Sequence, residues 1–333
     1  MSPCMCGDSE CPSCGAAQDT REYSPYGLDL FGEPIKQNTS SPVARKFIVP
    51  PFTVLNARDG DWQNRKRAWS SMGIQGEIGR EEDLTFTGAA KSFDHYRVKE
   101  GTRDKTDTQG TSIFDPVLCE LAYRWWCPDG GQVVDPFAGG SVRGVVASAL
   151  GRRYWGGELR PEQVEANRKQ AQDMCPDNPP VYVCGDSMNT LETAPAADFI
   201  FSCPPYGDLE KYSDDPGDLS NMEWHIFAAA YKRIILRACN CLKHDRFACF
   251  VVGDFRDKRG FFRDFVSLTV SAFRDSGLEL YNEAILVTAV GSAPIGVTKQ
   301  FEAGRKLVKT HQNVLVFCKG DWRKATKAIE VMP

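Results

Sequence analysis

The stretch SCPPYG, residues 202–207, combines residue types that can hold and orient a flat substrate. Pro204 and Pro205 stiffen the chain after a run of apolar residues, and Tyr206 follows them directly. A rigid turn of this kind can aim a backbone carbonyl at a ligand, and an aromatic ring can stack on a base. Cys203 precedes the prolines, where a thiol could act as a nucleophile or only fill space.

A second group of candidate residues combines a Gly-Gly turn with three acidic side chains. The turn DPFAGGS spans residues 135–141 and matches neither the dinucleotide fingerprint nor the P-loop. Glu158 and Asp186 end the next two apolar segments, where carboxylates can accept hydrogen bonds from ribose hydroxyls and from an adenine amino group. Each acidic residue alone is better explained as a helix N-cap. Asp135, Glu158 and Asp186 at three consecutive strand ends predict one bound nucleoside.

Alternating apolar strands and amphipathic helices from residue 111 onward predict a Rossmann-like α/β domain over residues 111–325. No helix is expected between the last two strands, so they should form an antiparallel hairpin. The expected sheet is therefore mostly parallel and seven-stranded, and the candidate residues follow its first four strands, where such sheets bind ligands. The expected strands lie within residues 131–137, 152–159, 180–186, 197–206, 246–254, 278–290 and 312–321.

Residues 1–45 form a predicted flexible tail, rich in Pro, Ser, Gly, Asp and Asn. The tail contains the pattern C-x-C-x4-C-x2-C, and four thiolates at this spacing could close a tetrahedral structural zinc site. A reduced, disordered tail is the alternative. The candidate metal ligands are Cys4, Cys6, Cys11 and Cys14.

Residues 46–110 form a predicted N-terminal extension with aromatic and basic residues close together. A short helix over DGDWQNRKRAWSSMG would carry Trp62 and Trp69 beside the basic run 65–67. Such a face can contact DNA, because cations hold phosphates and rings stack on bases. The alternative is a helix whose tryptophans pack on the main domain.

The net charge of −4 excludes a protein that is basic over its whole surface, but it leaves room for a local basic groove. The basic clusters 256–263 and 304–311 could contact phosphates, although either could be an ordinary solvated face. No apolar run approaches the ~20 residues of a membrane helix, and no signal peptide is evident. These features predict a cytoplasmic protein without a membrane partner.

DPFAGGS followed by CPPY resembles the amino-group DNA methyltransferases, which methylate adenine N6 or cytosine N4. The segment SIFDPVLCELAYRWWCPDGG is similar to the family segment that covers the methionine end of the cofactor. The whole chain resembles DNA methylases encoded by bacteriophages and prophages. This resemblance implies the S-adenosylmethionine-dependent methyltransferase fold, S-adenosyl-L-methionine as cofactor, duplex DNA as partner, base flipping, and the cytoplasm of a bacterial host.

The resemblance also implies roles for individual residues. Tyr206 would stack on the flipped base, and the Pro204 carbonyl would accept a hydrogen bond from the target amine. The implied catalytic residues are Ser202, Cys203, Pro204, Pro205 and Tyr206. The implied cofactor-binding residues are Phe114, Asp115, Pro116, Asp135, Pro136, Phe137, Ala138, Gly139, Gly140, Ser141, Glu158, Leu159, Asp186 and Ser187.

One position departs from the family pattern, because Cys203 stands where the family has Asp, Asn or Ser. A thiol is a weak hydrogen-bond acceptor, and adjacent strand residues point to opposite faces, so Ser202 cannot simply take its place. Adenine N6 is preferred to cytosine N4 as target. The alternatives are a pyrimidine C5 methyltransferase with Cys203 as nucleophile, an RNA methyltransferase, and a non-catalytic nucleic-acid-binding module. The sequence sets neither the recognition site nor the oligomeric state.

Overall fold

The computed structural model describes residues 42–74, 114–207, 213–288 and 293–329. Within these ranges no helix is long and apolar enough to cross a membrane. The same residues contain no group of three or more His, Cys, Asp or Glu side chains placed to hold a metal ion. The four predicted zinc ligands lie outside the described ranges: Cys4, Cys6, Cys11 and Cys14.

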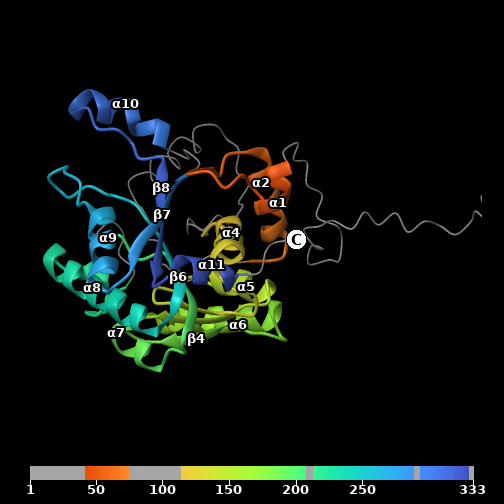
Figure 1. Ribbon diagram of the computed structural model, residues 1–333. Helices are drawn as coiled ribbons and strands as arrows, with labels where there is room; N and C mark the ends of the chain where they lie inside the picture. Colours follow the sequence, from red (N-terminus) through yellow and green to blue (C-terminus); the bar gives the residue numbers. More distant parts are fainter. Residues whose placement is uncertain (1–41, 75–113, 208–212, 289–292, 330–333) are drawn as a thin grey trace, which may run out of the picture.

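An eight-stranded sheet forms the centre of the fold (Figure 1). Its strands are β1 (Val54–Asn56), β2 (Gln132–Asp135), β3 (Arg153–Glu158), β4 (Val181–Cys184), β5 (Ala197–Ser202), β6 (Leu242–Val252), β7 (Glu279–Val287) and β8 (His311–Lys319). Their order across the sheet is β1-β7-β8-β6-β5-β2-β3-β4. Every residue of β2 and β5 is buried, as expected for parallel strands covered on both faces.

Strand β8 runs against its two neighbours, β6 and β7, whereas every other neighbouring pair is parallel. The predicted antiparallel pairing of the last two strands is therefore confirmed. Two details of the prediction are wrong. The sheet has eight strands because β1 pairs with β7, with Val54 opposite Ile285. A helix, α10 (Ala293–Gly304), also lies between β7 and β8, where no helix was expected.

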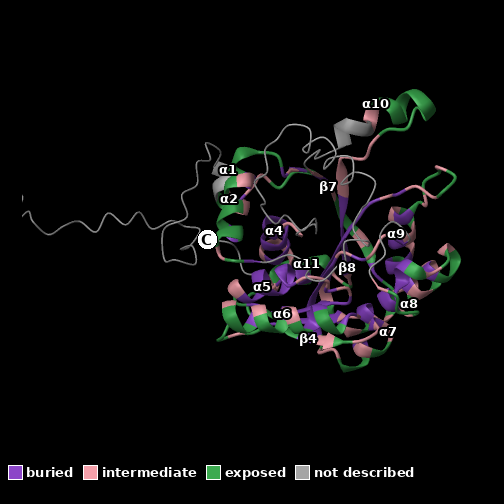
Figure 2. Cartoon of the chain, turned by 180° about the vertical axis from the view of Figure 1, so that it is seen from behind, coloured by how far each residue is buried: buried purple, intermediate pink, exposed green. Residues whose placement is uncertain are grey.

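Helices cover both faces of the sheet, and Figure 2 shows the buried residues concentrated between these layers. One layer comprises α4 (Pro116–Trp126), α5 (Val142–Ala149), α6 (Pro161–Met174) and α11 (Trp322–Lys327). The other layer comprises α7 (Ser187–Thr190), η2 (Leu191–Thr193), η4 (Leu219–Asn221), α8 (Trp224–Cys241) and α9 (Phe265–Asp275). Neighbouring strand residues serve opposite layers: Val133 packs in the first, Val134 in the second.

The described part of the N-terminal extension packs on the main domain. It contains α1 (Pro42–Phe47), β1 and α2 (Gly60–Ser71), and α2 lies against α4. Trp62 and Trp69 are only 2% and 8% exposed, and their indole N–H groups donate to Asp115 and Glu120 respectively. The packing alternative for the two tryptophans is therefore correct, and neither ring is free to stack on a base.

Two of the three basic residues between these tryptophans also face acidic partners on or beside α4. Arg65 forms an ion pair with the buried Glu120, and Lys66 Nζ lies 3.2 Å from Asp115 Oδ2. The helix α2 thus attaches to the α4 layer through two ion pairs and two indole hydrogen bonds. This attachment joins the extension to the helix that begins directly after Asp115.

Candidate active site

A cavity of about 290 Å³ lies at the carboxyl edge of β2, β3, β4 and β5. These strands are mutually parallel, so the turns that follow them meet at one edge of the sheet. Strand β8 is antiparallel and therefore begins at this same edge. The predicted site residues that line the cavity are Phe114, Pro136, Phe137, Gly139, Gly140, Glu158, Leu159, Asp186, Ser187, Cys203, Pro204, Pro205 and Tyr206.

Six of the predicted catalytic and cofactor-binding residues do not line the cavity. Asp115 caps α4 by accepting hydrogen bonds from the N–H groups of Val117 and Leu118, and it also binds the α2 residues described above. Burial and internal hydrogen bonds make these residues supports for the cavity wall. The six are Asp115, Pro116, Asp135, Ala138, Ser141 and Ser202.

Asp135 is completely buried and holds together the turn after β2. Its Oδ2 atom accepts hydrogen bonds from Arg143 Nε at 2.6 Å and the Tyr154 hydroxyl at 2.7 Å. Its Oδ1 atom accepts from the Ser202 hydroxyl at 2.5 Å and the Phe137 N–H at 3.0 Å. Burial acts to lower the pKa of Arg143, but the charge and hydrogen bond of Asp135, together with Tyr154 and Cys203, outweigh it and raise that pKa. Asp135 therefore positions the cavity wall and does not reach the cavity.

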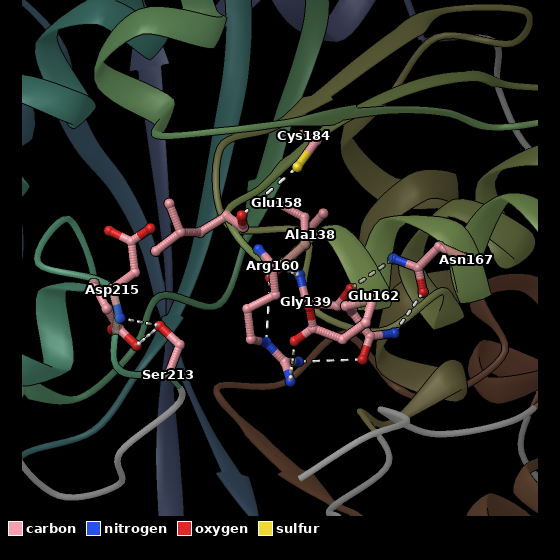
Figure 3. A network of polar contacts seen from close by, with 12 residues as sticks. Ala138, Gly139, Glu158, Arg160, Glu162, Asn167, Cys184, Ser213 and Asp215 are labelled. Carbon is pink, nitrogen blue, oxygen red and sulfur yellow. Dashed lines mark hydrogen bonds and ion pairs between the residues drawn. The ribbon is translucent and has the colours of Figure 1, made fainter.

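Glu158 ends β3 and binds the Gly-Gly turn of the neighbouring strand. Its Oε2 accepts a hydrogen bond from the Gly139 N–H at 2.9 Å, and its Oε1 accepts one from the Arg160 N–H at 3.0 Å (Figure 3). Gly139 has a φ of +50°, which side-chain-bearing residues rarely adopt. Asn167 of α6 completes the support by donating to the Gly139 carbonyl at 2.7 Å. The carboxylate thus lines the cavity while fixing the turn.

The end of β4 places a second carboxylate on the cavity wall. Asp186 caps α7, because its side chain accepts a hydrogen bond from the Met188 N–H at 2.8 Å. The neighbouring Ser187 donates its hydroxyl hydrogen bond to the Pro136 carbonyl, which joins this strand end to the DPFAGGS turn. Asp186 is therefore both the N-cap expected from sequence statistics and a cavity-lining carboxylate.

Ser202 and Cys203 have different environments, as strand alternation predicts. Ser202 is fully buried and donates to Asp135, whereas Cys203 lines the cavity. The Cys203 Sγ lies 3.9 Å from the Tyr206 hydroxyl oxygen. The cysteine, and not the serine, is therefore the side chain before the prolines that a ligand in the cavity would meet.

The Tyr206 ring is held from three sides. It stacks on Phe255 with ring centroids 6.3 Å apart and an interplanar angle of 6°, and it makes a T-shaped contact with Phe265 at a centroid distance of 5.7 Å. Its hydroxyl accepts a hydrogen bond from Gln312 Nε2 at 2.8 Å. Gln312 is the second residue of β8 and also lines the cavity. This arrangement fixes the plane of the tyrosine ring at the cavity wall.

Sequence analysis missed nine cavity-lining residues, among them Arg143 and Gln312, whose side chains contact predicted site residues. Arg143 had a detectable signal, because it is a charged residue inside the apolar helical stretch SVRGVVASAL. The side chain is buried beside Asp135, and its guanidinium lies 4.7 Å from the centre of the Phe114 ring. Gln312 had no such signal, because it lies 106 positions from Tyr206 and no local pattern marks it.

The segment after the CPPY turn contributes one wall of the cavity through Gly217, Asp218 and Leu219. Asp218 is buried and accepts a hydrogen bond from the Ser213 hydroxyl at 2.9 Å. Figure 3 shows Ser213 and Asp215 to one side of Glu158 and Arg160. Three described residues of this segment thus line the site, while residues 208–212 lie outside the described ranges.

The two ends of the cavity, which lie at different points along the sheet edge, offer different chemical groups. Towards β3 and β4 it offers the carboxylates of Glu158 and Asp186, which accept hydrogen bonds from hydroxyl and amino groups. Towards β5 and β8 it offers an aromatic ring, a thiol, a carboxamide and the backbone of two prolines. This arrangement can hold a polar nucleoside at one end and present a flat, amine-bearing ring at the other.

Neither a protein-family model nor a curated protein matches the sequence. Solved structures match the chain at low sequence identity. TrmN from Thermus thermophilus is 14% identical over 62% of this chain and 49% of that chain, with a TM-score of 0.42. The chain thus spans about half the length of TrmN. A candidate RNA methyltransferase from Pyrococcus horikoshii is 14% identical over 78% of this chain and 100% of that chain, with a TM-score of 0.46.

A candidate DNA modification methylase, also from Thermus thermophilus, is 17% identical over 41% of this chain and 51% of that chain, with a TM-score of 0.31. The strand order, with parallel strands and a reversed β8, gives the present chain a Rossmann-like α/β fold. Proteins described as acting on RNA and on DNA both occur among these matches. A fold does not by itself select a substrate, so the substrate has to be argued from the residues of the site.

Proposed function

We propose that this protein transfers a methyl group from S-adenosylmethionine to an exocyclic amino group of a DNA base, with adenine N6 ahead of cytosine N4. One observation carries the proposal. A single cavity joins the acidic ends of β3 and β4 to the Cys-Pro-Pro-Tyr turn at the end of β5. A cofactor held at the first end would have its reactive group directed towards an acceptor held at the second.

The residues at the acidic end fit the proposed cofactor. Glu158 and Asp186 can accept hydrogen bonds from ribose hydroxyls and an adenine amino group, and Phe114 contributes an apolar surface. The turn is also shaped for close approach, since Gly139 adopts a positive φ that a larger residue would strain. When bound, S-adenosylmethionine supplies an electrophilic methyl group on a sulfonium.

At the other end the chain must hold the target amine and leave its nitrogen lone pair free to react. Tyr206 offers a fixed ring face, and stacking of a base on an aromatic ring contributes ~1–3 kcal/mol. The Pro204 carbonyl is the first proposed acceptor for an amine hydrogen. Because Cys203 supplies only a weak acceptor and Ser202 is bound to Asp135, a second acceptor is required.

We assign that second acceptor to the side-chain oxygen of Gln312. Its Nε2 donates to Tyr206, which leaves Oε1 of the same carboxamide as an acceptor in the cavity. Cys203 Sγ lies near the same tyrosine hydroxyl, so the carboxamide and the thiol approach one point. In this proposal Gln312 performs the task that Asp, Asn or Ser performs at the position of Cys203 in the family that the sequence resembles.

The proposed function is tested by incubating the full chain with S-adenosylmethionine and duplex DNA, followed by mass spectrometry of the nucleosides. We expect N6-methyladenine, or N4-methylcytosine. A product of 5-methylcytosine would contradict amino methylation and favour a nucleophilic Cys203. Methylation of structured RNA alone, in a parallel reaction, would contradict the DNA substrate. Absence of S-adenosylmethionine binding in calorimetry would favour a non-catalytic binding module.

A further inference from the structure

The loop of residues 255–263 follows β6 and is closed by its own hydrogen bonds. Arg263 N–H donates to the Phe255 carbonyl at 2.9 Å, and Asp257 N–H donates to the Phe261 carbonyl at 2.8 Å. The Asp257 side chain accepts from the Phe261 N–H at 2.9 Å, and Arg256 pairs with Phe262 in an isolated β-bridge. These contacts give the 255–263 loop a defined shape despite its position outside the sheet.

Two phenylalanines at the tip of the 255–263 loop are exposed to solvent. Phe261 is 66% exposed and Phe262 is 52% exposed. Arginines accompany both rings: the guanidinium of Arg256 lies 4.0 Å from the centre of the Phe262 ring, and that of Arg259 lies 5.7 Å from the Phe261 ring. Two adjacent exposed aromatic side chains add nothing to the core and indicate a contact surface.

The base of the same loop packs against Tyr206, the ring that is proposed to stack on the target base. Phe255, buried at 6% exposure, stacks on Tyr206. The backbone of Arg263 is hydrogen-bonded to Phe255. Phe261 is two residues from Arg263, so at most about 7 Å of chain separates Phe261 from the base of the loop. The exposed rings therefore project from the chain segment that fixes the orientation of Tyr206.

A second basic segment meets the 255–263 loop. An added Cβ on Gly260 would lie 2.6 Å from Lys306 Nζ, so this ammonium sits directly against the loop. Lys309 lies at the loop's base, since an added Cβ on Gly253 would be 3.6 Å from Lys309 Cε and 3.9 Å from Tyr206 Cε2. Lys306 and Lys309 of the second basic cluster thus lie beside the basic 255–263 loop.

The acidic residues of this region are outnumbered by the basic ones, with three aspartates at 254, 257 and 264 against six cations at 256, 258, 259, 263, 306 and 309. Asp257 accepts hydrogen bonds from backbone N–H groups and from Arg259 inside the loop. Asp254 accepts from the Val266 N–H at 3.0 Å, and Asp264 accepts from the Ser267 hydroxyl at 2.7 Å. Cations that surround two exposed aromatic rings match a polyanion with stacked bases, which is the chemistry of nucleic acid.

We propose that Phe261 and Phe262 form a wedge that enters the base stack of duplex DNA beside the target nucleotide while the basic side chains hold the flanking phosphates. Apolar side chains inserted between base steps replace stacking that is lost when a base leaves the helix. The wedge rests on the proposed function, because it needs a target base that moves from the duplex into the Tyr206 site. Its role is to lower the cost of that movement.

The wedge is tested with Phe261→Ala, Phe262→Ala and the double variant of the full chain. Each is assayed on a matched duplex, on the same duplex with a mismatch opposite the target base, and on the single strand. The double variant should lose at least about tenfold in kcat/KM on the matched duplex, because unstacking a base step is costly. It should lose less than about threefold on the mismatched duplex and the single strand, where the target base is already loosened.

Leu236→Ala serves as the matched control, because Leu236 is an exposed apolar residue (45%) near the end of α8. This variant should leave all three rates unchanged. Fluorescence of 2-aminopurine placed at the target position adds a readout of flipping: it should rise with the parent protein and not with the double variant. Thermal unfolding of all variants should match the parent, since the substituted rings are exposed.

Equal losses on matched and mismatched duplexes would overturn the wedge, because a phosphate-binding or folding role affects both substrates. Unchanged rates of the double variant on the matched duplex would overturn it as well. Failure of the proposed function gives a different result. In that case the parent protein methylates none of the three DNA substrates, whatever the residues at positions 261 and 262.

Discussion

The side-chain amide of Gln312 donates a hydrogen bond of 2.8 Å to the hydroxyl of Tyr206, although the two residues are 106 positions apart. Tyr206 follows β5, and Gln312 belongs to the antiparallel strand β8. Because β8 begins at the edge where β5 ends, the reversed strand delivers a carboxamide to the cavity. This contact links the Tyr206 ring, which is proposed to stack on the target base, to the Gln312 carboxamide, which is proposed to accept a hydrogen bond from the target amine.

Replacement of Gln312 by leucine should lower kcat for DNA methylation by about 10- to 100-fold, since a hydrogen bond to a group developing charge contributes ~1.5–3 kcal/mol. Gln312→Glu keeps an acceptor oxygen and should retain more activity than Gln312→Leu. Calorimetry should show unchanged cofactor affinity for both, because Gln312 lies at the acceptor end. Adding Cys203→Asp to Gln312→Leu should restore part of the rate. Full activity of Gln312→Leu would contradict the assigned role.

Replacement of Cys203 by serine distinguishes amino methylation from C5 methylation with a cysteine nucleophile. Cys203 lines the cavity 3.9 Å from the Tyr206 hydroxyl. Amino methylation predicts retained or increased activity for Cys203→Ser, because a hydroxyl is a better hydrogen-bond acceptor than a thiol. A C5 mechanism predicts loss of activity together with loss of any trapped covalent protein–DNA complex. Rate measurements and denaturing gels of the trapped complex separate these outcomes.

Substitution of Glu158 should weaken cofactor binding. Removing a carboxylate acceptor costs ~1.5–3 kcal/mol per charged hydrogen bond, so Glu158→Ala should raise the Kd of S-adenosylmethionine by about 10- to 100-fold in calorimetry. Glu158→Gln should have a smaller effect, since it keeps one acceptor oxygen. Glu162→Gln is the matched control, because that carboxylate is 58% exposed. An unchanged Kd for Glu158→Ala would exclude Glu158 from the cofactor site.

The stability of the fold should depend on pH through Glu120. Burial acts to raise the pKa of this carboxyl, but the charge and hydrogen bond of Arg65, together with Arg124 and Trp69, lower it from 4.5 to about 2. The carboxylate therefore stabilises the folded state above pH 4.5, and this contribution disappears as the pH falls from 4.5 towards 2. The full effect is about 3 kcal/mol.

Urea denaturation between about pH 5 and 3, which spans the upper part of this transition, checks the prediction. The free energy of unfolding of Glu120→Gln should fall less steeply over this range than that of the parent, because the glutamine does not titrate. Glu192→Gln provides a control at an exposed ion pair with Arg237, which contributes little to stability. Identical slopes for the parent and Glu120→Gln would show that Glu120 does not account for the acid sensitivity.

Local patterns in the sequence were sufficient for most of the parallel sheet. Buried strands such as β2 and β5 are short apolar runs followed by turn residues, and Pro116 and Pro161 mark the first residues of α4 and α6. The helix α10 was not predicted, because its sequence APIGVTKQFEAG has Pro and Gly near its start and resembles a loop. The edge strand β1 was placed in the extension, because its three residues carry no sign of their partner β7.

The candidate site, like the fold, was predicted only where local sequence patterns mark its residues. Glu158, Asp186 and the Cys-Pro-Pro-Tyr turn were identified because each directly follows an apolar strand, and parallel strands end at a common edge. The basic and aromatic residues of α2 were ambiguous, because their composition suits both a DNA-binding face and a packed helix. Burial of Trp62 and Trp69 against α4 decided that question.

The sequence by itself determined the positions of the strand ends and of the groups attached to them, since apolar periodicity and turn chemistry are local properties. Only the tertiary structure decided that Cys203 faces the cavity while Ser202 binds Asp135. It also decided that Gln312 and Phe255 both meet Tyr206. These contacts depend on the register and direction of strands distant in the chain, which are set by packing of the whole sheet.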